Sequence, residues 1–304
     1  MKTSLLLLTA TLWSMCLFLL TACASAPVVE NASGGSAVTG TVSGTDADSV
    51  SVTETLSGTD LTVVCFQAGK ADAFLLLTPN STVLIDCGEK GFGRTILSEL
   101  ETRGIRQLDC MMITHFDQDH VGGAARIINN FPVSRILQSN SPKDSEEYEK
   151  YLKAVTNAGI EPETVRETLT FVLDGVRYTV NAPKRSTYAN DASNNSSLIV
   201  SVENGENRLL FTGDAEDERM EEFLSEDWGT YDFLKVPHHG RWQETLSALV
   251  DMTAPRYAVI TSSDDEPEDA QTLELLQSAG VETYLTRNGA VTVHSDGVEL
   301  TVTQ

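Results

Sequence analysis

Short apolar runs alternate with amphipathic segments over most of this chain. Leu61–Phe66, Phe74–Leu77 and Thr82–Ile85 are β-prone runs bounded by turn residues, which predicts three strands with a hairpin between the last two. Apolar residues then recur at helical spacing in Gly93–Arg103 and Ser145–Ala158. This alternation of strands and helices predicts a layered α/β fold.

The later part of the chain consists of further strand-like runs joined by tight turns. Thr168–Leu173 and Val176–Val180 flank an Asp-Gly turn and predict a hairpin. Nearer the C-terminus, we expect Thr283–Leu285 and Ala290–His294 to pair as another hairpin, followed by a strand at Val298–Val302.

The start of the chain has the pattern of an export signal. Lys2 precedes an apolar run that ends in Leu-Thr-Ala-Cys at residues 20–23. This ending resembles the lipobox of bacterial lipoproteins, so residues 1–22 are expected to be a signal peptide. Cys23 would then carry the lipid that anchors the exported chain to the outer face of the bacterial membrane. A plain secretory signal and a retained membrane helix are the alternatives. Residues 23–60 are rich in small and polar residues and predict a flexible linker, which leaves 61–304 as the folded domain.

Composition narrows the choice of partners. The chain has 44 acidic and 21 basic side chains and a formal net charge of −23. Such a charge repels polyanions at long range, so a nucleic-acid partner is possible but disfavoured. Cys65, Cys87 and Cys110 lie in apolar, strand-like runs, which predicts buried free thiols rather than disulfides.

The densest group of chemically active residues is the segment T-H-F-D-Q-D-H-V-G-G, which follows the apolar run Met111–Ile113. It places His115, Asp117, Asp119 and His120 within six positions, on what we expect to be a tight loop at a strand end. Imidazole and carboxylate are ligands for divalent ions. An acidic surface loop with two chance histidines is the alternative, but the chain has only five histidines. The segment therefore predicts a metal site.

Other predicted strands end in residues of the same kinds. These strand-end candidates are Asp86 in D-C-G, Asp214 in L-L-F-T-G-D-A-E, and His238 and His239 in V-P-H-H-G. Asn194 and Asn195 in N-N-S-S-L-I-V are further candidates that precede a predicted strand, with an ordinary turn as the alternative. A single Gly-Asp after a strand is a weak signal. In combination with the His-Asp loop it becomes a strong one.

The motif H-x-D-x-D-H-V-G-G resembles the metal-binding signature of the metallo-β-lactamase fold superfamily, whose usual form is H-x-H-x-D-H. An aspartate at the position of Asp117 is typical of one branch, the C-terminal hydrolase domain of ComEC/Rec2-type DNA-uptake proteins and its free-standing relatives. Q-A-G-K-A-D-A at 67–73 and the V-P-H-H-G segment are similar to the same branch. The resemblance implies a four-layer αββα sandwich, with two mixed sheets and helices on both outer faces.

The resemblance also implies roles for the candidate residues. Asp214 would bridge two ions, and Asp86 would support the metal loop from behind, although capping of the next helix is an equal alternative. Asp119 and His239 are expected to act in catalysis, with His239 orienting the substrate or protonating a leaving group. Asn194 and Asn195 occupy the place of a third histidine motif and are possible contributors near the substrate. The expected ligands of one or two Zn or Mn ions are His115, Asp117, Asp119, His120, Asp214 and His238.

Two segments depart from the branch pattern. Family members usually continue with serines after H-H-G, whereas this chain has Arg241-Trp242-Gln243. Where relatives commonly show an asparagine and a G-H-P turn, this chain reads S-S-D-D-E-P at 262–267. These departures concern contacts with the substrate.

The function implied is hydrolysis by a metal-activated water, with phosphodiesters of nucleic acid or nucleotides as the expected substrates. A metallohydrolase of another class, acting on a β-lactam or lactone, is one alternative. A cell-surface binding protein that retains the fold without turnover is the other. No feature of the sequence indicates an oligomeric state.

Overall fold

The structure is a computed structural model, and it describes residues 57–304. The expected signal peptide, the lipidation site Cys23 and nearly all of the expected linker lie outside the described residues. Between residues 57 and 304, no helix combines the length and the apolar character that crossing a bilayer requires.

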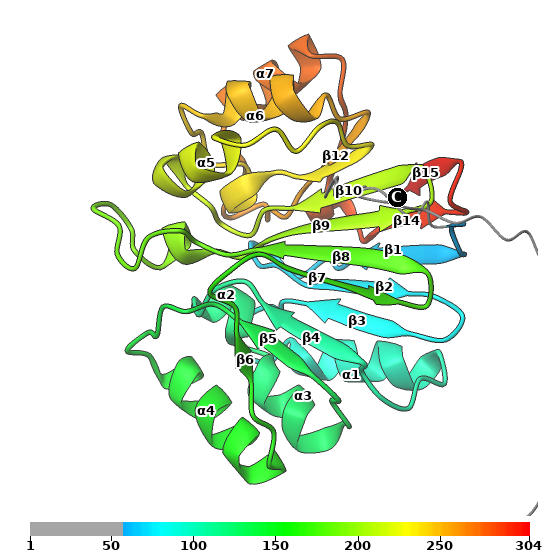
Figure 1. Cartoon of the computed structure of the whole chain (residues 1–304), viewed down its shortest axis with the longest axis vertical. Helices are drawn as coiled ribbons and strands as arrows, with labels where there is room; N and C mark the ends of the chain where they lie inside the picture. The colour runs from blue at the N-terminus through cyan, green and yellow to red at the C-terminus, as the bar shows by residue number, and fades with distance from the viewer. Residues whose placement is uncertain (1–56) are drawn as a thin grey trace, which may run out of the picture. The chain divides into compact units, whose positions relative to one another are not determined.

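The first of two sheets has eight strands in the order β15-β14-β1-β2-β3-β4-β5-β6 (Figure 1). Strands β3 to β6 run parallel to one another, and the remaining neighbours pair antiparallel. The strands are β1 (Leu61–Cys65), β2 (Phe74–Leu77), β3 (Thr82–Ile85), β4 (Cys110–Ile113), β5 (Ile136–Gln138), β6 (Glu163–Thr164), β14 (Val291–Ser295) and β15 (Leu300–Thr303).

The second sheet has seven strands in the order β13-β12-β11-β10-β9-β8-β7. Here β10 to β13 are parallel, and β7 to β10 form antiparallel pairs. The strands are β7 (Leu169–Leu173), β8 (Val176–Asn181), β9 (Ile199–Asn204), β10 (Asn207–Phe211), β11 (Phe233–Lys235), β12 (Tyr257–Ile260) and β13 (Glu282–Leu285).

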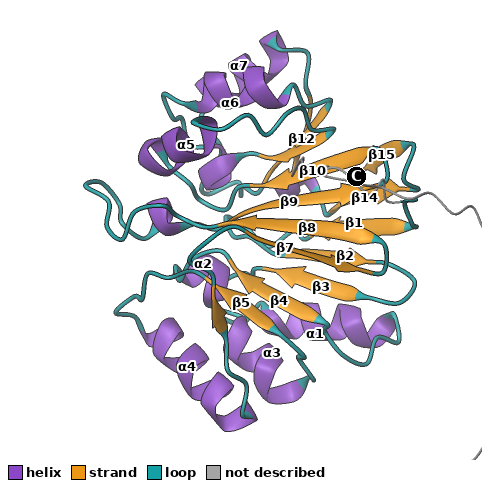
Figure 2. Ribbon diagram, in the orientation of Figure 1, coloured by secondary structure: helices purple, strands orange, loops and turns teal. Residues whose placement is uncertain are grey.

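Helices cover the outer face of each sheet, as Figure 2 shows. The helices are α1 (Gly93–Thr102), α2 (Gln118–Val121), α3 (Ala124–Asn130), α4 (Glu146–Ala158), α5 (Asp217–Leu224), α6 (Leu246–Thr253) and α7 (Ala270–Ser278). Helices α1, α3 and α4 pack on the first sheet, and α5, α6 and α7 on the second.

Alternation along single strands explains why the chain forms layers. On β3, Val83 and Ile85 belong to the core between the sheets, whereas Leu84 belongs to the core under α1 and α3. Successive side chains of a strand point to opposite faces, so a fully apolar strand must be covered on both sides. The four-layer αββα sandwich is therefore confirmed. Cys65, Cys87 and Cys110 are buried free thiols, also as predicted.

The hairpin expected between residues 283–285 and 290–294 is wrong. β13 belongs to the second sheet, where it extends the parallel pairing of β12, and β14 belongs to the first sheet between β1 and β15. A short turn at Thr286–Asn288 carries the chain from one sheet to the other. An alternating apolar pattern shows which face of a strand is buried but not which sheet the strand joins.

Candidate metal centre

The His-Asp motif lies where β4 ends and contains one turn of helix rather than only a loop. Asp117 precedes α2, and Asp119 and His120 lie within it. The two glycines that follow allow close packing against the preceding segment. A Cβ atom added to Gly123 would lie 2.2 Å from the carbonyl oxygen of Cys87, so a side chain cannot be accommodated there. The motif is thereby pressed against the chain that follows β3.

Four side chains from the two sheets converge at one point. Asp119 and His120 follow β4 of the first sheet, whereas Asp214 and His239 follow β10 and β11 of the second. One ligand atom from each of the four lies within 4.8 Å of every other. Nε2 of His239 lies 3.0 Å from Oδ2 of Asp214, and Nε2 of His120 lies 3.2 Å from Oδ1 of Asp214. We call these four residues the ligand cluster.

Hydrogen bonds fix the orientation of the two histidine rings. Nδ1 of His120 lies 2.9 Å from Oδ2 of Asp86, and Nδ1 of His239 lies 3.0 Å from the carbonyl oxygen of Thr261. Because a carboxylate and a carbonyl only accept, both Nδ1 atoms carry the proton. In the neutral form of each ring, the lone pair is then on Nε2, which faces the cluster, as in metal-binding histidines.

Asp86 supports the motif from behind. Its backbone φ of 56° is in the left-handed region, which aspartate tolerates better than most residues. Besides His120, its carboxylate accepts hydrogen bonds from the amide and the hydroxyl of Thr114, at 2.8 and 2.7 Å. It therefore holds both the strand end and the histidine ring.

His115 lies next to the cluster without joining it. Its ring centroid is 4.1 Å from that of His120, and its Nδ1 lies 3.2 Å from the hydroxyl of Thr114. Its Nε2 is buried and has no hydrogen-bond partner, a condition shared by Nε2 of His120 and Nε2 of His239. The two such nitrogens that belong to the ligand cluster, beside its two carboxylates, fit the coordination of a divalent ion.

The charges of the ligand cluster oppose the effect of burial on the pKa values of its members. Burial disfavours the charged form of His120, but Asp214 and Asp86 outweigh it and raise its pKa well above the usual value. The pKa of His239 is raised in the same way, with Asp214 as the largest opposing influence on burial. The pKa values of Asp214 and Asp119 are lowered although burial alone would raise them, because both face histidines. The carboxylates therefore have a larger effect than burial at this point, and the cluster favours a cation.

Residues 237–240 place the two adjacent histidines differently. His238 and His239 both have positive φ, 46° and 53°, so the backbone turns sharply between them. The buried His239 belongs to the ligand cluster. His238, which was expected to be the ligand, instead has 19% of its side chain exposed and lies with Nδ1 3.2 Å from Oε1 of Glu216. Sequence cannot distinguish neighbours whose directions depend on such a turn.

The remaining expected site residues lie at the edge of the cluster or away from it. Asp117 pairs with Lys143 and with the hydroxyl of Ser193. The amide of Asn194 donates to Glu216 at 3.0 Å and so lies beside His238. Asn195 accepts from the backbone of Arg219 at 2.9 Å and donates to backbone carbonyls, which fixes the start of α5 rather than the site.

Two buried charges outside the predicted set of site residues complete the site. Nζ of Lys235 lies 2.6 Å from Oδ2 of Asp72 and 3.4 Å from Oδ1 of Asp214. Asp72 also accepts from the hydroxyl of Thr261 at 2.6 Å, the residue that holds His239. A lysine within the otherwise apolar strand Phe233–Lys235 was the available signal, because a charged side chain in a central strand needs a buried partner.

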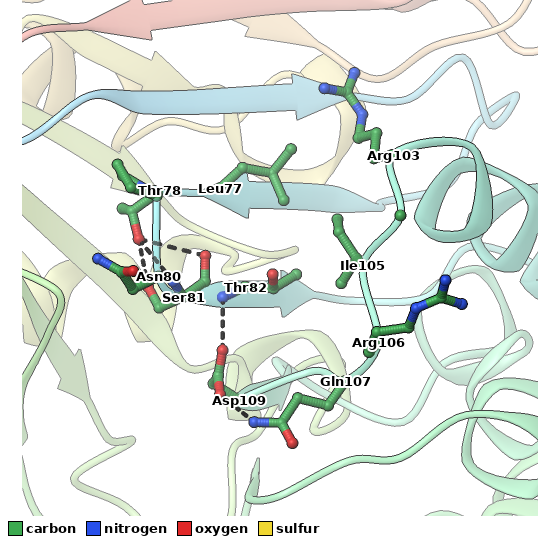
Figure 3. Close-up of a pocket in the computed structure, with 12 residues that line it drawn as sticks. Leu77, Thr78, Asn80, Ser81, Thr82, Arg103, Ile105, Arg106, Gln107 and Asp109 are labelled. Carbon is green, nitrogen blue, oxygen red and sulfur yellow. Dashed lines mark hydrogen bonds between the residues drawn. The ribbon is translucent and has the colours of Figure 1, made fainter.

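A cavity between the start of β3 and the end of α1 lies away from this chemistry. It has a volume of about 610 Å³ and is lined by the turn between β2 and β3 and by the segment after α1, including Leu77, Arg103 and Arg106 (Figure 3). That turn precedes β3, whereas the ligand cluster lies beyond the opposite ends of β3 and β4. No residue of the ligand cluster lines the cavity.

Comparison with known proteins agrees with this geometry. The sequence profile of the Metallo-beta-lactamase superfamily matches residues 67–262. The chain belongs to this superfamily. The matched range contains the whole ligand cluster together with Asp72, Asp86 and Lys235, so the superfamily match covers both the four side chains and the groups that position them.

Curated relatives place the chain in one branch of the superfamily. ComE operon protein 3 of Bacillus subtilis is 29% identical over 207 residues, which cover 65% of this chain and 26% of that protein. Recombination protein 2 of Haemophilus influenzae is 26% identical over 204 residues, covering 66% and 24%. These are ComEC/Rec2-type proteins, so the predicted resemblance to that branch is confirmed. The chain spans about a quarter of the length of these relatives.

Solved structures share the fold at low sequence identity. The metallo-beta-lactamase fold protein YhfI from Bacillus subtilis has a TM-score of 0.51 at 10% identity, covering 80% of this chain and 100% of that one. A variant of the β-hydroxylase CmlA has a TM-score of 0.54 at 15% identity, covering 77% and 54%. These similarities concern the architecture alone.

Proposed function

We propose that this chain is a metal-dependent hydrolase of phosphodiesters, with a divalent ion held by the ligand cluster. The observation that supports this most directly is the convergence of Asp119, His120, Asp214 and His239, with imidazole lone pairs directed inward. Two nitrogens and two carboxylates suit Zn²⁺ and, because of the oxygen ligands, also Mn²⁺. When bound, such an ion supplies an acidified water and polarises the scissile group.

The exposure of the site side chains suggests which of them contact the solvent and the substrate. Asp119 has 22% of its side chain exposed, whereas the other three cluster members are buried, so it is the member that meets solvent and substrate. Its lowered pKa keeps it ionised and able to accept a hydrogen bond. The partly exposed His238, paired with Glu216, is better placed than the buried His239 to donate a proton to a leaving group.

The choice of phosphodiesters is supported by the relatives and limited by charge. The relatives include a recombination protein and a competence protein, names that point to nucleic acid. The net charge of −23 opposes a long polyanion. We therefore propose a short or single-stranded phosphodiester as the substrate.

The proposal includes a location outside the cell. The L-T-A-C sequence at 20–23 supports lipid attachment at Cys23. Labelled palmitate should enter the wild-type chain in a bacterial host and should not enter a Cys23→Ser variant. Equal labelling of both chains would contradict the anchor.

A screen with matched variants tests the activity. Purified protein is assayed with bis(p-nitrophenyl) phosphate, an oligodeoxynucleotide and a chromogenic β-lactam, with Mn²⁺, Zn²⁺ or EDTA. We expect metal-dependent cleavage of the phosphodiesters, at least about a hundredfold reduced by His120→Ala. His294→Ala is the control, because His294 is exposed on β14 and far from the cluster in the sequence. Cleavage of the β-lactam alone, or no turnover with any metal, would overturn the proposal.

A further inference from the structure

Lys143 approaches the motif from outside its own strand and helix. It lies in the segment between β5 and α4, and its ammonium pairs with Oδ1 of Asp117. The hydroxyl of Ser193, from the segment before β9, donates to the same oxygen. Nζ of Lys143 also lies 3.3 Å from that hydroxyl. Three separate parts of the chain therefore meet at one carboxylate oxygen.

This arrangement occupies the place where a second ion would need a ligand. Residues 57–304 contain two groups of three or more side chains that could hold a metal ion. Neither group includes His115 or Asp117. Nε2 of His115 lies 3.9 Å from Oδ1 of Asp117, and it is buried without a hydrogen-bond partner. His115 and Asp117 are thus a potential pair of ligands, but the ammonium of Lys143 already neutralises the carboxylate of Asp117.

We propose that the chain binds one divalent ion, at the ligand cluster, and that the ammonium of Lys143 takes the place of a second ion beside Asp117. The inference rests on the proposed function in one respect, since it assumes that the ligand cluster holds metal. It adds that this chain combines one metal ion with one fixed organic cation.

The ammonium also has a donor left for a ligand. An ammonium has three N–H groups, and Asp117 and Ser193 account for two of them. The side chain of Lys143 keeps 33% of its surface exposed, so the third donor can reach a molecule at the mouth of the site. A charge-assisted hydrogen bond of this kind suits a non-bridging oxygen of a phosphate, the group that the proposed substrates carry.

Metal content per chain tests the inference without using turnover. Full-length protein is dialysed against Mn²⁺ or Zn²⁺, and bound metal is counted by elemental analysis and by titration calorimetry. We expect one ion in the wild type, one in Lys143→Arg and two in Lys143→Met. Adding Asp117→Asn to Lys143→Met should return the count to one. Lys153→Met is the matched control, because it removes a lysine from the exposed face of α4 and should leave one ion.

The outcomes separate the two proposals. Two ions in the wild type, or one ion in a folded Lys143→Met, would overturn the role of Lys143 and leave the metal site intact. No bound ion in any folded variant would overturn both. As a second readout, Lys143→Met/Asp117→Asn, which is expected to hold one ion, should have a KM for bis(p-nitrophenyl) phosphate about tenfold or more above that of Asp117→Asn alone. An unchanged KM would contradict the contact with phosphate.

Discussion

Nζ of Lys235 lies 2.6 Å from Oδ2 of Asp72, and both side chains are buried. The pair joins the two halves of the sandwich, because Lys235 ends β11 of the second sheet and Asp72 lies between β1 and β2 of the first. The ammonium also donates to the carbonyl oxygen of Gly213 at 2.8 Å. Lys235 therefore fixes the residue before Asp214, and with it the position of one cluster carboxylate.

Replacing Lys235 should destabilise the fold strongly. Lys235→Met leaves two buried carboxylates without their cation, a change that costs about 3–5 kcal/mol in comparable cases. Urea unfolding of the metal-free protein would measure the loss, with the surface variant Lys153→Met as the control. The double variant Lys235→Met/Asp72→Asn should recover part of the stability, since one of the two unpaired charges is gone. A single variant as stable as the wild type would show that the pair is not important for folding.

The two adjacent histidines should differ in their effect on metal binding. Asparagine tolerates positive φ, so His238→Asn and His239→Asn both respect the backbone at this turn. An ion present at a hundred times its Kd stabilises a protein by about 2.7 kcal/mol, which appears as a rise in Tm. We expect His239→Asn to lose most of this rise and His238→Asn to keep it. The reverse result would assign the ligand to His238.

Asp86 should affect metal affinity without touching the ion. Asp86→Asn keeps the size and the backbone preference of the side chain but removes the charge that orients His120. Loss of such a supporting carboxylate costs about 10–100-fold in metal affinity. Competition with a chromogenic chelator would measure it. An affinity equal to that of the wild type would show that Thr114 and the backbone suffice to hold the ring.

Acid should weaken the metal-free fold through His115. Burial, and then the neighbouring charge of His120, lower the pKa of His115 from 6.5 to about 3. Between these values the unfolded chain binds a proton that the folded chain does not. Stability from this group is therefore lost as pH falls from 6.5 towards 3, by about 1.4 kcal/mol per pH unit. In EDTA, the stability of His115→Asn should depend less steeply on pH in this interval, as followed by guanidinium unfolding. Parallel curves would exclude His115 as the cause.

Much of the architecture follows from local patterns in the sequence. Val83, Leu84 and Ile85 are apolar in succession, which requires cover on both faces and hence a layered fold. The spacing of His115 to His120 likewise predicts ligands at the end of a strand. Such features depend on a few consecutive residues, so the sequence contains them directly.

Other features depend on contacts between distant segments. β13 and β14 are separated by five residues yet belong to different sheets, a choice made by β12 and β1. Lys143 reaches Asp117 across 26 positions, and no local pattern marks it. The choice of His239 over His238 depends on two backbone angles within a single turn. These outcomes are decided by packing after the elements have formed, which is why pattern and propensity do not predict them.

The ligand cluster takes two members from each sheet, and this has a consequence for assembly. Neither half of the chain can provide all four ligands alone. Tight binding of an ion therefore indicates that the two halves have packed together correctly. A bound ion would then link the two sheets of the sandwich at their shared edge. Removal of the metal would weaken the contact between the two sheets first, and the helix-covered outer layers would stay folded longer.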